Sequence, residues 1–348
     1  RCCNIPALER IASGVFISQD FFMPFKHNAA RRHKIPKARF RVTNWPDYNE
    51  SLRGRGDITV WIEESVAQVW FARPRKQRGR PATFSDLAIE TCLQIRAVFA
   101  LALRQTQGFV RSVLGLMGLN LPAPDFSTLS RRASSLKLSR PKQQTNLEPS
   151  TLVIDSTGVK VFGAGEWQET KHGTRVKRRK WRKLHLGLDL NSGDIICCEL
   201  TEENVADPSA LPDLLDQVVD PIATFLGDGA YDGEPSRNEL EKRYDGVEVI
   251  IPPPKTAVPS LEAETAPTQR DRDVLAIEKN GRMAWQKANG YGRRSRGETL
   301  MGRYKQVIGH SVKSRKLNNQ KMEAKIGVSV LNKMTALGRP AFERVLAT

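Results

Sequence analysis

A strict alternation of leucine with other residues limits the fold more than any other feature of this sequence. Between residues 183 and 190 leucine occupies every second position, which is the period of a β-strand with one buried face. The run Asn191, Ser192 and Gly193 predicts a turn. Residues 194–200 predict the returning strand, so the two segments together predict an antiparallel hairpin. His185 falls on the face opposite the leucines and lacks metal-ligand spacing, so we expect it to be structural or at the surface.

The segments around this hairpin predict the rest of one sheet. A short apolar strand at residues 152–154 ends in Asp155, and another at 223–226 leads to Asp228. Helices are predicted at residues 207–219 and 235–244 and twice between 294 and 337, a strand at 247–251, and a surface excursion at 256–280. A hairpin followed by alternating helices and strands predicts an α/β protein with a mixed sheet flanked by helices. The element order resembles the ribonuclease-H-like fold, which we expect to span residues 150–340.

A smaller helical domain is expected before the sheet, over residues 84–140. Its helices are predicted at residues 84–104, 109–117 and 128–136. Ser85 and Ser127 are candidate N-caps, and Gly108 predicts the turn between the first two helices. The third helix carries Arg131 and Arg132. Helix, turn and basic helix resemble a helix-turn-helix reader of the DNA major groove, although the same spacing also fits a plain helical bundle.

The start of the chain is basic and broken by proline and glycine. Residues 23–83 form this basic N-terminal region, in which residues 57–72 predict a short strand and a helix. The chain opens on Arg1, and Met23 is the first methionine that resembles a start. We expect residues 1–22 to be an upstream extension without function.

The charge of the chain indicates a polyanionic partner. A total of 55 Lys and Arg against 38 Asp and Glu gives a net charge of +17 and a pI near 9.9. Nucleic acid is the commonest such partner, and a merely well-solvated basic surface is the alternative. No apolar run approaches the roughly 20 residues of a membrane span, and no basic amphipathic helix stands out, so no membrane partner is expected. The five cysteines follow no disulfide or zinc pattern, which fits the cytoplasm.

Two aspartates are the first candidates for chemistry. Asp155 and Asp228 each follow a short apolar strand, and ligand sites of α/β sheets gather at such strand ends. For either residue alone, an ordinary strand-terminating aspartate is the alternative.

A third carboxylate belongs to a spaced set of four polar residues. Tyr291, Arg294, Glu298 and Lys305 would share one narrow face of an α-helix at about 100° per residue. The alternative is a solvated stripe in which Arg294 and Glu298 form an ion pair one helical turn apart. Gly292, Gly297 and Gly302 lower the helix propensity of the same stretch.

These motifs resemble the DDE transposases of bacterial insertion sequences. The carrying residues are Asp155 in VIDSTG, Asp228 in FLGDGAYD and the spacing of the four polar residues, which matches the YREK signature of the insertion-sequence-four and insertion-sequence-five groups. Segments such as SDLAIETCLQIRAVFALALRQTQGF and NNQKMEAKIGVSVLNKMTALG are closest to the second group. The resemblance implies that Asp155, Asp228 and Glu298 are catalytic and hold two Mg²⁺ ions, with Mn²⁺ as a substitute. It further implies that Tyr291, Arg294 and Lys305 hold the DNA backbone.

The same resemblance implies an activity and its partners. We expect hydrolysis at the ends of an insertion sequence, followed by attack of the freed 3′-hydroxyl on target DNA. The partners would be double-stranded DNA, namely terminal inverted repeats and target, and a second copy in a homodimer, in a bacterial cytoplasm at the nucleoid. Two alternatives stay open: a catalytically inactive DNA-binding relic or repressor of the element, and a nuclease without strand transfer.

A basic run just before the hairpin is a further candidate for DNA contact. Residues 171–183 are rich in Lys and Arg, and a solvated charge run is the alternative. The candidates in the run are Arg178, Arg179, Lys180, Trp181, Arg182 and Lys183.

Overall fold

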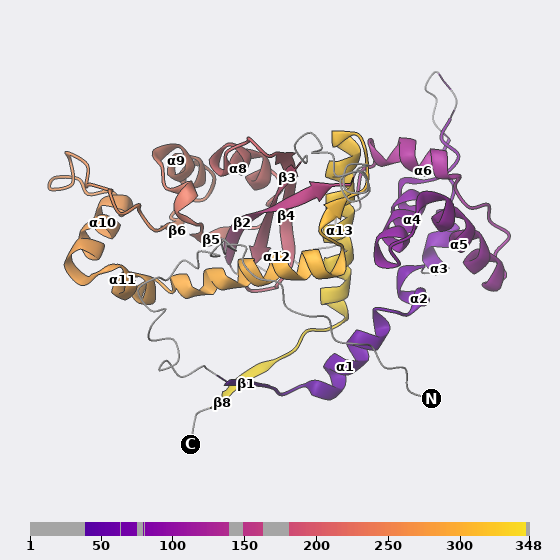
Figure 1. Ribbon diagram of the computed structural model, residues 1–348, viewed down its shortest axis with the longest axis horizontal. Coiled ribbons are helices and arrows are strands. Elements are labelled where there is room, and N and C mark those ends of the chain that lie inside the picture. The colour runs from indigo at the N-terminus through magenta and orange to yellow at the C-terminus, as the bar shows by residue number, and fades with distance from the viewer. Residues whose placement is uncertain are drawn as a thin grey trace, which may run out of the picture. The chain divides into compact units, whose positions relative to one another are not determined.

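The structure, a computed structural model, describes residues 39–62, 64–74, 79, 81–138, 149–162 and 181–345 (Figure 1). The chain divides into two compact units, Pro46–Arg339 and a small one made of Arg1–Trp45 with Pro340–Thr348. In the small unit, β1 (Arg39–Val42) pairs antiparallel with β8 (Phe342–Val345). None of the helices in the described part of the chain is long and apolar enough to cross a membrane.

A six-stranded mixed sheet organises the large unit, in the order β4-β3-β2-β5-β6 with β7 beside the end of β2. Its strands are β2 (Ser150–Val161), β3 (Trp181–Asp189), β4 (Ile195–Glu202), β5 (Ile222–Leu226), β6 (Glu248–Ile250) and β7 (Ser311–Val312). β2, β3 and β4 are antiparallel neighbours, whereas β5, β6 and β7 run parallel to β2 or to one another. This hairpin beside parallel strands confirms the expected α/β, ribonuclease-H-like arrangement.

Helices cover both faces of this sheet, so the strands are more buried than the alternation predicted. The covering helices are α8 (Asp207–Leu215), α9 (Glu234–Arg243), α12 (Ser295–Val307) and α13 (Leu317–Leu337). Leucines of β3 pack with α12 and α13, while β2 and β5 residues of the other face pack with α8 and α9 (Figure 1). His185 is fully buried, so the expectation of a half-buried strand was wrong. Its Nε2 lies 3.0 Å from the Thr201 hydroxyl, which fits a structural role.

The excursion expected at residues 256–280 is helical over its second half. α10 (Gln269–Asn280) begins at a capping box, in which Thr268 and Asp271 satisfy each other's backbone N–H groups. α11 (Arg282–Ala288) and the 3₁₀ helix η3 (Tyr291–Arg294) then lead into α12. The sequence does not predict this helix start, because proline, threonine and charged residues dominate the segment.

Within the described residues, six helices precede the sheet, and their boundaries differ from those expected. They are α1 (Trp45–Gly54), α2 (Ile58–Trp61), α3 (Glu64–Gln68), α4 (Asp86–Val98), α5 (Leu103–Leu116) and α6 (Phe126–Ala133). Ser85 caps α4 as expected, accepting from the Ala88 N–H. The break follows Val98 rather than Gly108, because Ala100 adopts a positive φ of 52° and the Leu101 N–H closes on the Arg96 carbonyl at 3.0 Å.

Two further expectations in this region were wrong because an aspartate caps a helix at a position where the sequence pattern indicated something else. Asp125 rather than Ser127 caps α6, since its carboxylate accepts from the Ser127 N–H at 2.8 Å. The strand expected at the start of residues 57–72 is the short helix α2, which Asp57 caps through the Thr59 N–H. The core of these helices also includes Ile326 and Val330 of α13.

Candidate active site

Asp155 and Asp228 lie side by side on two parallel strands. Val153 of β2 pairs with Leu226 of β5, so the two aspartates stand two residues further along each chain. Asp155 is not at a strand end as expected: β2 continues to Val161 because it pairs with β3 along its whole length and then with β7. Asp228 lies two residues after the end of β5. It caps the short 3₁₀ helix η2 (Gly229–Tyr231) by accepting from the Ala230 N–H at 3.0 Å.

A glycine lets α12 approach β2 beside Asp155. A Cβ atom at Gly297 would stand 3.2 Å from Val153 Cγ1, 3.4 Å from Asp155 Cβ and 3.6 Å from Asp155 Oδ2. The next residue, Glu298, lies in the first turn of α12. Close approach of helix and strand therefore places the start of α12 beside Asp155. In the sequence Gly297 stood out only as a residue of low helix propensity. A glycine directly before the candidate glutamate was the available sign that the helix packs closely on another element.

Arg294 joins the carboxylates of two different elements. Its Nη1 donates to Asp155 Oδ2 at 3.1 Å and its Nη2 to Glu298 Oε1 at 3.2 Å. The side chain of Arg294 is 18% exposed and that of Asp155 is 14% exposed, whereas that of Glu298 is 65% exposed. The Arg294–Glu298 ion pair, which belonged to the alternative of a solvated stripe, is therefore present, but as part of a bridge to the sheet.

The other two members of the spaced set also reach this region. Lys305 lies about two helical turns after Glu298 on α12, and its Nζ donates to the Thr157 hydroxyl of β2 at 2.6 Å. Tyr291 lies in η3 rather than on the α-helix, so the four residues do not share one regular helical face as expected. Its ring packs on Trp285, with centroids 6.1 Å apart. Nothing in the sequence pattern singled out Thr157 as a partner.

Burial sets the electrostatics of the site. Desolvation raises the pKa of Asp155 above its ordinary value, the Arg294 charge opposes this rise, and the nearby Asp228 adds to it. Burial likewise raises the pKa of Tyr291, against the charge and hydrogen bond of Arg294. For Arg294 burial alone would lower the pKa, but Tyr291 and the carboxylates around it raise it overall. The positive charge of the Arg294 guanidinium thus offsets part of the negative charge of the carboxylates around it.

The donor set suits a hard divalent cation. Asp155, Asp228 and Glu298 offer only carboxylate oxygens, the ligands that Mg²⁺ and Mn²⁺ prefer. Within the described ranges, no three acidic, histidine or cysteine side chains stand close enough together to hold a metal ion. The guanidinium of Arg294 stands between two of the three carboxylates instead. The carboxylate donors suit Mg²⁺ or Mn²⁺, but the Arg294 side chain must move before Asp155 and Glu298 can bind one ion together.

Several basic residues expected to contact DNA have partners inside the protein. Arg132 of α6 pairs with Asp86 and donates to the Phe84 carbonyl, whereas Arg131 is exposed and donates within α6 to the Ser127 carbonyl and the Thr128 hydroxyl. Arg182 donates to Gln320 at 2.9 Å, and Lys183 donates to the Val205 carbonyl at 2.9 Å.

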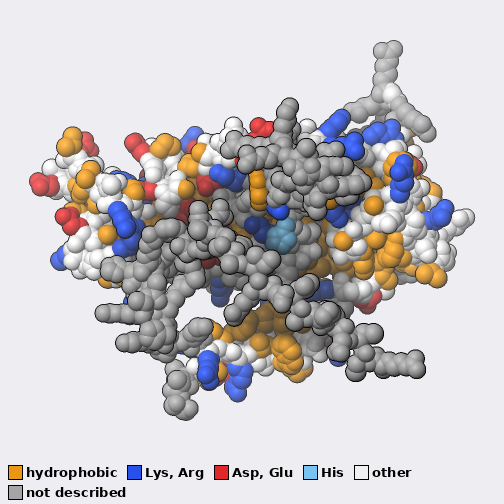
Figure 2. Space-filling model, viewed as in Figure 1, with side chains coloured by type: hydrophobic (Ala, Val, Ile, Leu, Met, Phe, Trp, Pro, Cys, Tyr) orange, Lys and Arg blue, Asp and Glu red, His pale blue; other side chains and the backbone are white. Residues whose placement is uncertain are grey.

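The remaining members of the basic run differ from these in their surroundings. Trp181 is 36% exposed, and the Lys160 ammonium lies 5.9 Å from its ring. Arg178, Arg179 and Lys180 lie outside the described residues. On the face drawn in Figure 2, Lys and Arg side chains gather over α4–α6, and acidic ones over α9 and α10.

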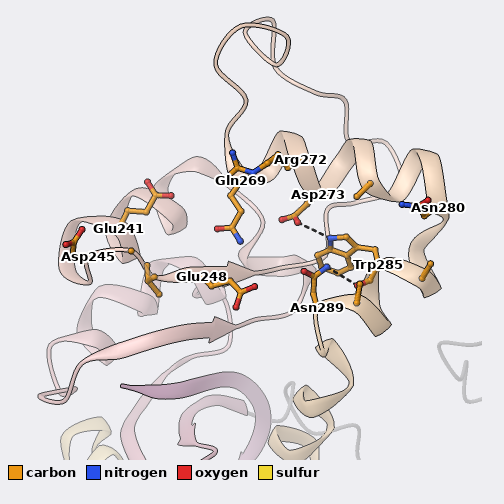
Figure 3. A pocket seen from close by; sticks show the side chains of 14 residues that line it. Glu241, Asp245, Glu248, Gln269, Arg272, Asp273, Asn280, Trp285 and Asn289 are labelled. Carbon is orange, nitrogen blue, oxygen red and sulfur yellow. Dashed lines mark hydrogen bonds between the residues drawn. The ribbon is translucent and has the colours of Figure 1, made fainter. Parts of the chain in front are cut away.

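A cavity of about 1140 Å³ lies between β6, α9, α10 and α11 (Figure 3). Glu241, Asp245 and Glu248 line one side of it. Across from them is Trp285, whose indole N–H donates to Asp273 at 2.9 Å. The same indole also packs on Tyr291.

A ribonuclease-H-like sheet with neighbouring aspartates on two parallel strands and a helical glutamate defines the class of fold. The family of the transposase DDE domain matches this chain over residues 53–164 and again over residues 146–333. The second match covers more than half of the 348 residues, and the chain belongs to this family. Members act in DNA transposition as nucleases and strand transferases, and the family generally uses divalent metal ions.

Solved transposase structures are distantly similar to this chain. A piggyBac transposase synaptic complex with hairpin DNA is 11% identical, with 81% of this chain and 73% of that chain covered and a TM-score of 0.37. A Mos1 transposase paired-end complex with the left transposon end is 14% identical, with 77% and 83% covered and a TM-score of 0.22. A Mos1 mariner paired-end complex with Mn is 15% identical, with 76% and 82% covered and a TM-score of 0.21.

Proposed function

We propose that this protein is the transposase of an insertion sequence of the insertion-sequence-five group, with the YREK signature at Tyr291, Arg294, Glu298 and Lys305. Asp155, Asp228 and Glu298 would be its catalytic residues. The observation that carries the proposal is the meeting of three elements: Asp155 and Asp228 at matching positions of β2 and β5, and Glu298 tied to Asp155 through Arg294.

The three carboxylates would hold two Mg²⁺ ions, for which Mn²⁺ can substitute. Such ions neutralise charge on the nucleophile, the phosphoryl oxygens and the leaving oxygen of a phosphodiester. Asp155 would contact both ions, Asp228 one and Glu298 the other. The role of the chain is to keep these carboxylates ionised and close together, which burial of Asp155 opposes and neighbouring positive charge assists.

Two reactions would use this one site. In hydrolysis, the oxygen of a water bonds to phosphorus at the end of the element and the bond to the 3′-oxygen breaks, leaving a 3′-hydroxyl and a 5′-phosphate. In strand transfer, that 3′-oxygen bonds to a phosphorus of target DNA and displaces a 3′-oxygen of the target. The number of phosphodiester bonds is unchanged in the second reaction, so it needs no external energy source.

The basic side chains around the carboxylates would hold the DNA backbone. Arg294 can grip a phosphate with two parallel bonds, while Lys305 supplies a point charge from α12. Tyr291 would lie along the same strand. Arg131 and Trp181 are exposed candidates for contacts farther from the cleaved bond. A homodimer would bring two element ends together.

An Asp155→Asn variant tests the catalytic assignment and the inactive-relic alternative together. Wild type and variant are incubated with Mg²⁺ and a plasmid that carries the DNA flanking the gene, and cut and joined products are sequenced. The proposal predicts equal DNA binding, with cutting and joining only by wild type. Binding by both proteins without cutting by either would identify a DNA-binding relic. Cutting without joined products would identify a nuclease that lacks strand transfer.

A further inference from the structure

Both oxygens of Asp155 are already engaged without any ligand. Oδ1 accepts from the Ser156 N–H at 2.9 Å, and Oδ2 accepts from Arg294 Nη1 at 3.1 Å. The other arm of the same guanidinium holds Glu298 Oε1 at 3.2 Å. Arg294 therefore holds one carboxylate oxygen of each of two of the three proposed metal ligands.

A guanidinium and a divalent cation compete for the same lone pairs. Paired N–H···O bonds between arginine and carboxylates are among the stronger hydrogen bonds in proteins. Burial strengthens this competition, since the Arg294 side chain is only 18% exposed and that of Asp155 only 14%. Glu298, by contrast, is 65% exposed, so its carboxylate is free to turn once the bridge opens.

A DNA phosphate is the ligand best suited to open this bridge. It offers the planar guanidinium two oxygens in the geometry that a carboxylate offers, so Arg294 can exchange partners without losing bonds. Arg294 also lies at the N-terminal end of α12, at the junction with η3, where its backbone leads directly into exposed residues. The exchange would release Asp155 and Glu298 together, because one side chain holds both.

We propose that Arg294 is a latch that keeps the metal-binding carboxylates closed until a DNA phosphate draws its guanidinium away. This inference rests on the proposed function and adds its regulation: metal binding and DNA binding are coupled through one side chain. By thermodynamic reciprocity, DNA tightens metal binding by the same factor by which metal tightens DNA binding. A site built this way stays incompetent on free protein and is completed only on its substrate.

Binding of Mn²⁺ measured by electron paramagnetic resonance tests the latch without any cleavage. The full-length protein is titrated with Mn²⁺ alone and with a short DNA duplex, with a duplex-only titration subtracted. Arg294→Gln is compared with Arg293→Gln, which removes the same unit of charge one residue away from an exposed side chain. Arg294→Lys keeps the charge but replaces the two-armed guanidinium by a single, shorter-reaching ammonium, and it serves as a second variant should the glutamine variant fold poorly.

The latch predicts that Arg294→Gln binds Mn²⁺ about tenfold more tightly than wild type without DNA, as expected from loss of a charge-assisted bond. Arg293→Gln should change the affinity less than about twofold, because exposed charge is screened. The duplex should tighten Mn²⁺ binding by wild type and Arg293→Gln but not by Arg294→Gln. Equal Mn²⁺ affinities of the two glutamine variants would overturn the latch while leaving the metal site intact. Absence of Mn²⁺ binding by every protein, even with DNA, would overturn the proposed metal site itself.

Discussion

Replacement of Gly297 by alanine should disturb the site without unfolding the protein. The new Cβ would stand 3.2 Å from Val153 Cγ1 and 3.4 Å from Asp155 Cβ, closer than the roughly 3.5–4.0 Å of optimal carbon contact. Either α12 or the Val153 side chain, two residues before Asp155 on β2, must then give way by a few tenths of an ångström. Gly302, on the same helix, has open space around the position of its missing Cβ. It supplies a matched control.

The expected magnitudes follow from this geometry. A misplacement of about 1 Å in an active site can cost a hundredfold in rate, so a shift of a few tenths should cost about three- to tenfold. Alanine adds up to about 1 kcal/mol of helix propensity, which offsets part of an overpacking cost of about 1–3 kcal/mol. Gly297→Ala should therefore unfold within about 2 kcal/mol of wild type. Gly302→Ala should be more stable than wild type by up to about 1 kcal/mol.

Initial rates of metal-dependent DNA cleavage and thermal unfolding curves measure both effects. We expect Gly297→Ala to cut more slowly and to need more Mn²⁺ for half-maximal rate, with DNA binding unchanged. Gly302→Ala should match wild type in rate. Equal rates and metal requirements for all three proteins would refute the inference that Gly297 sets the distance between α12 and Asp155.

Three further predictions concern other parts of the chain. Arg132→Ala should lower the free energy of unfolding by about 1 kcal/mol through loss of its part-buried ion pair, while Arg131→Ala should instead weaken DNA binding in a gel-shift assay; the reverse pattern would contradict the assignment. Because burial raises the pKa of Asp155 and metal binding needs its carboxylate, cleavage should fall as the pH drops through that raised value. A cleavage rate that stays constant toward acid pH would contradict this. Burial raises the pKa of Cys198 to about 12, so mass spectrometry after treatment with a thiol reagent should find it unmodified in native protein and modified in denaturant.

The hairpin could be predicted from the sequence because its pattern is local. Alternation of leucines fixed both the strand β3 and the face that packs on α12 and α13. The length of β2 was not readable, since Ser156, Thr157 and Gly158 directly after Asp155 are polar or small. The strand continues through them because β3 and β7 pair with it. The break after Val98 depends on the left-handed conformation of Ala100, a residue type that gives no such signal.

The site was predicted in part for similar reasons. Helical spacing correctly brought Arg294 and Glu298 together, but it could not reveal that Arg294 also binds Asp155, far away in sequence. Counting charges selected Arg182 and Lys183 as DNA contacts, whereas their hydrogen-bond partners lie on other elements. Tertiary partners of a charged side chain are invisible in a linear pattern.

The dependence of DNA cleavage on Glu298 and on metal tests the central claim most directly. A supercoiled plasmid that carries the DNA flanking the gene is incubated with wild type in Mg²⁺, with wild type in EDTA, and with Glu298→Gln in Mg²⁺. The account predicts nicked and linear products only for wild type with Mg²⁺, ending in 3′-hydroxyl groups. Cutting by Glu298→Gln at the wild-type rate, or cutting that persists in EDTA, would contradict a metal site built on these three carboxylates.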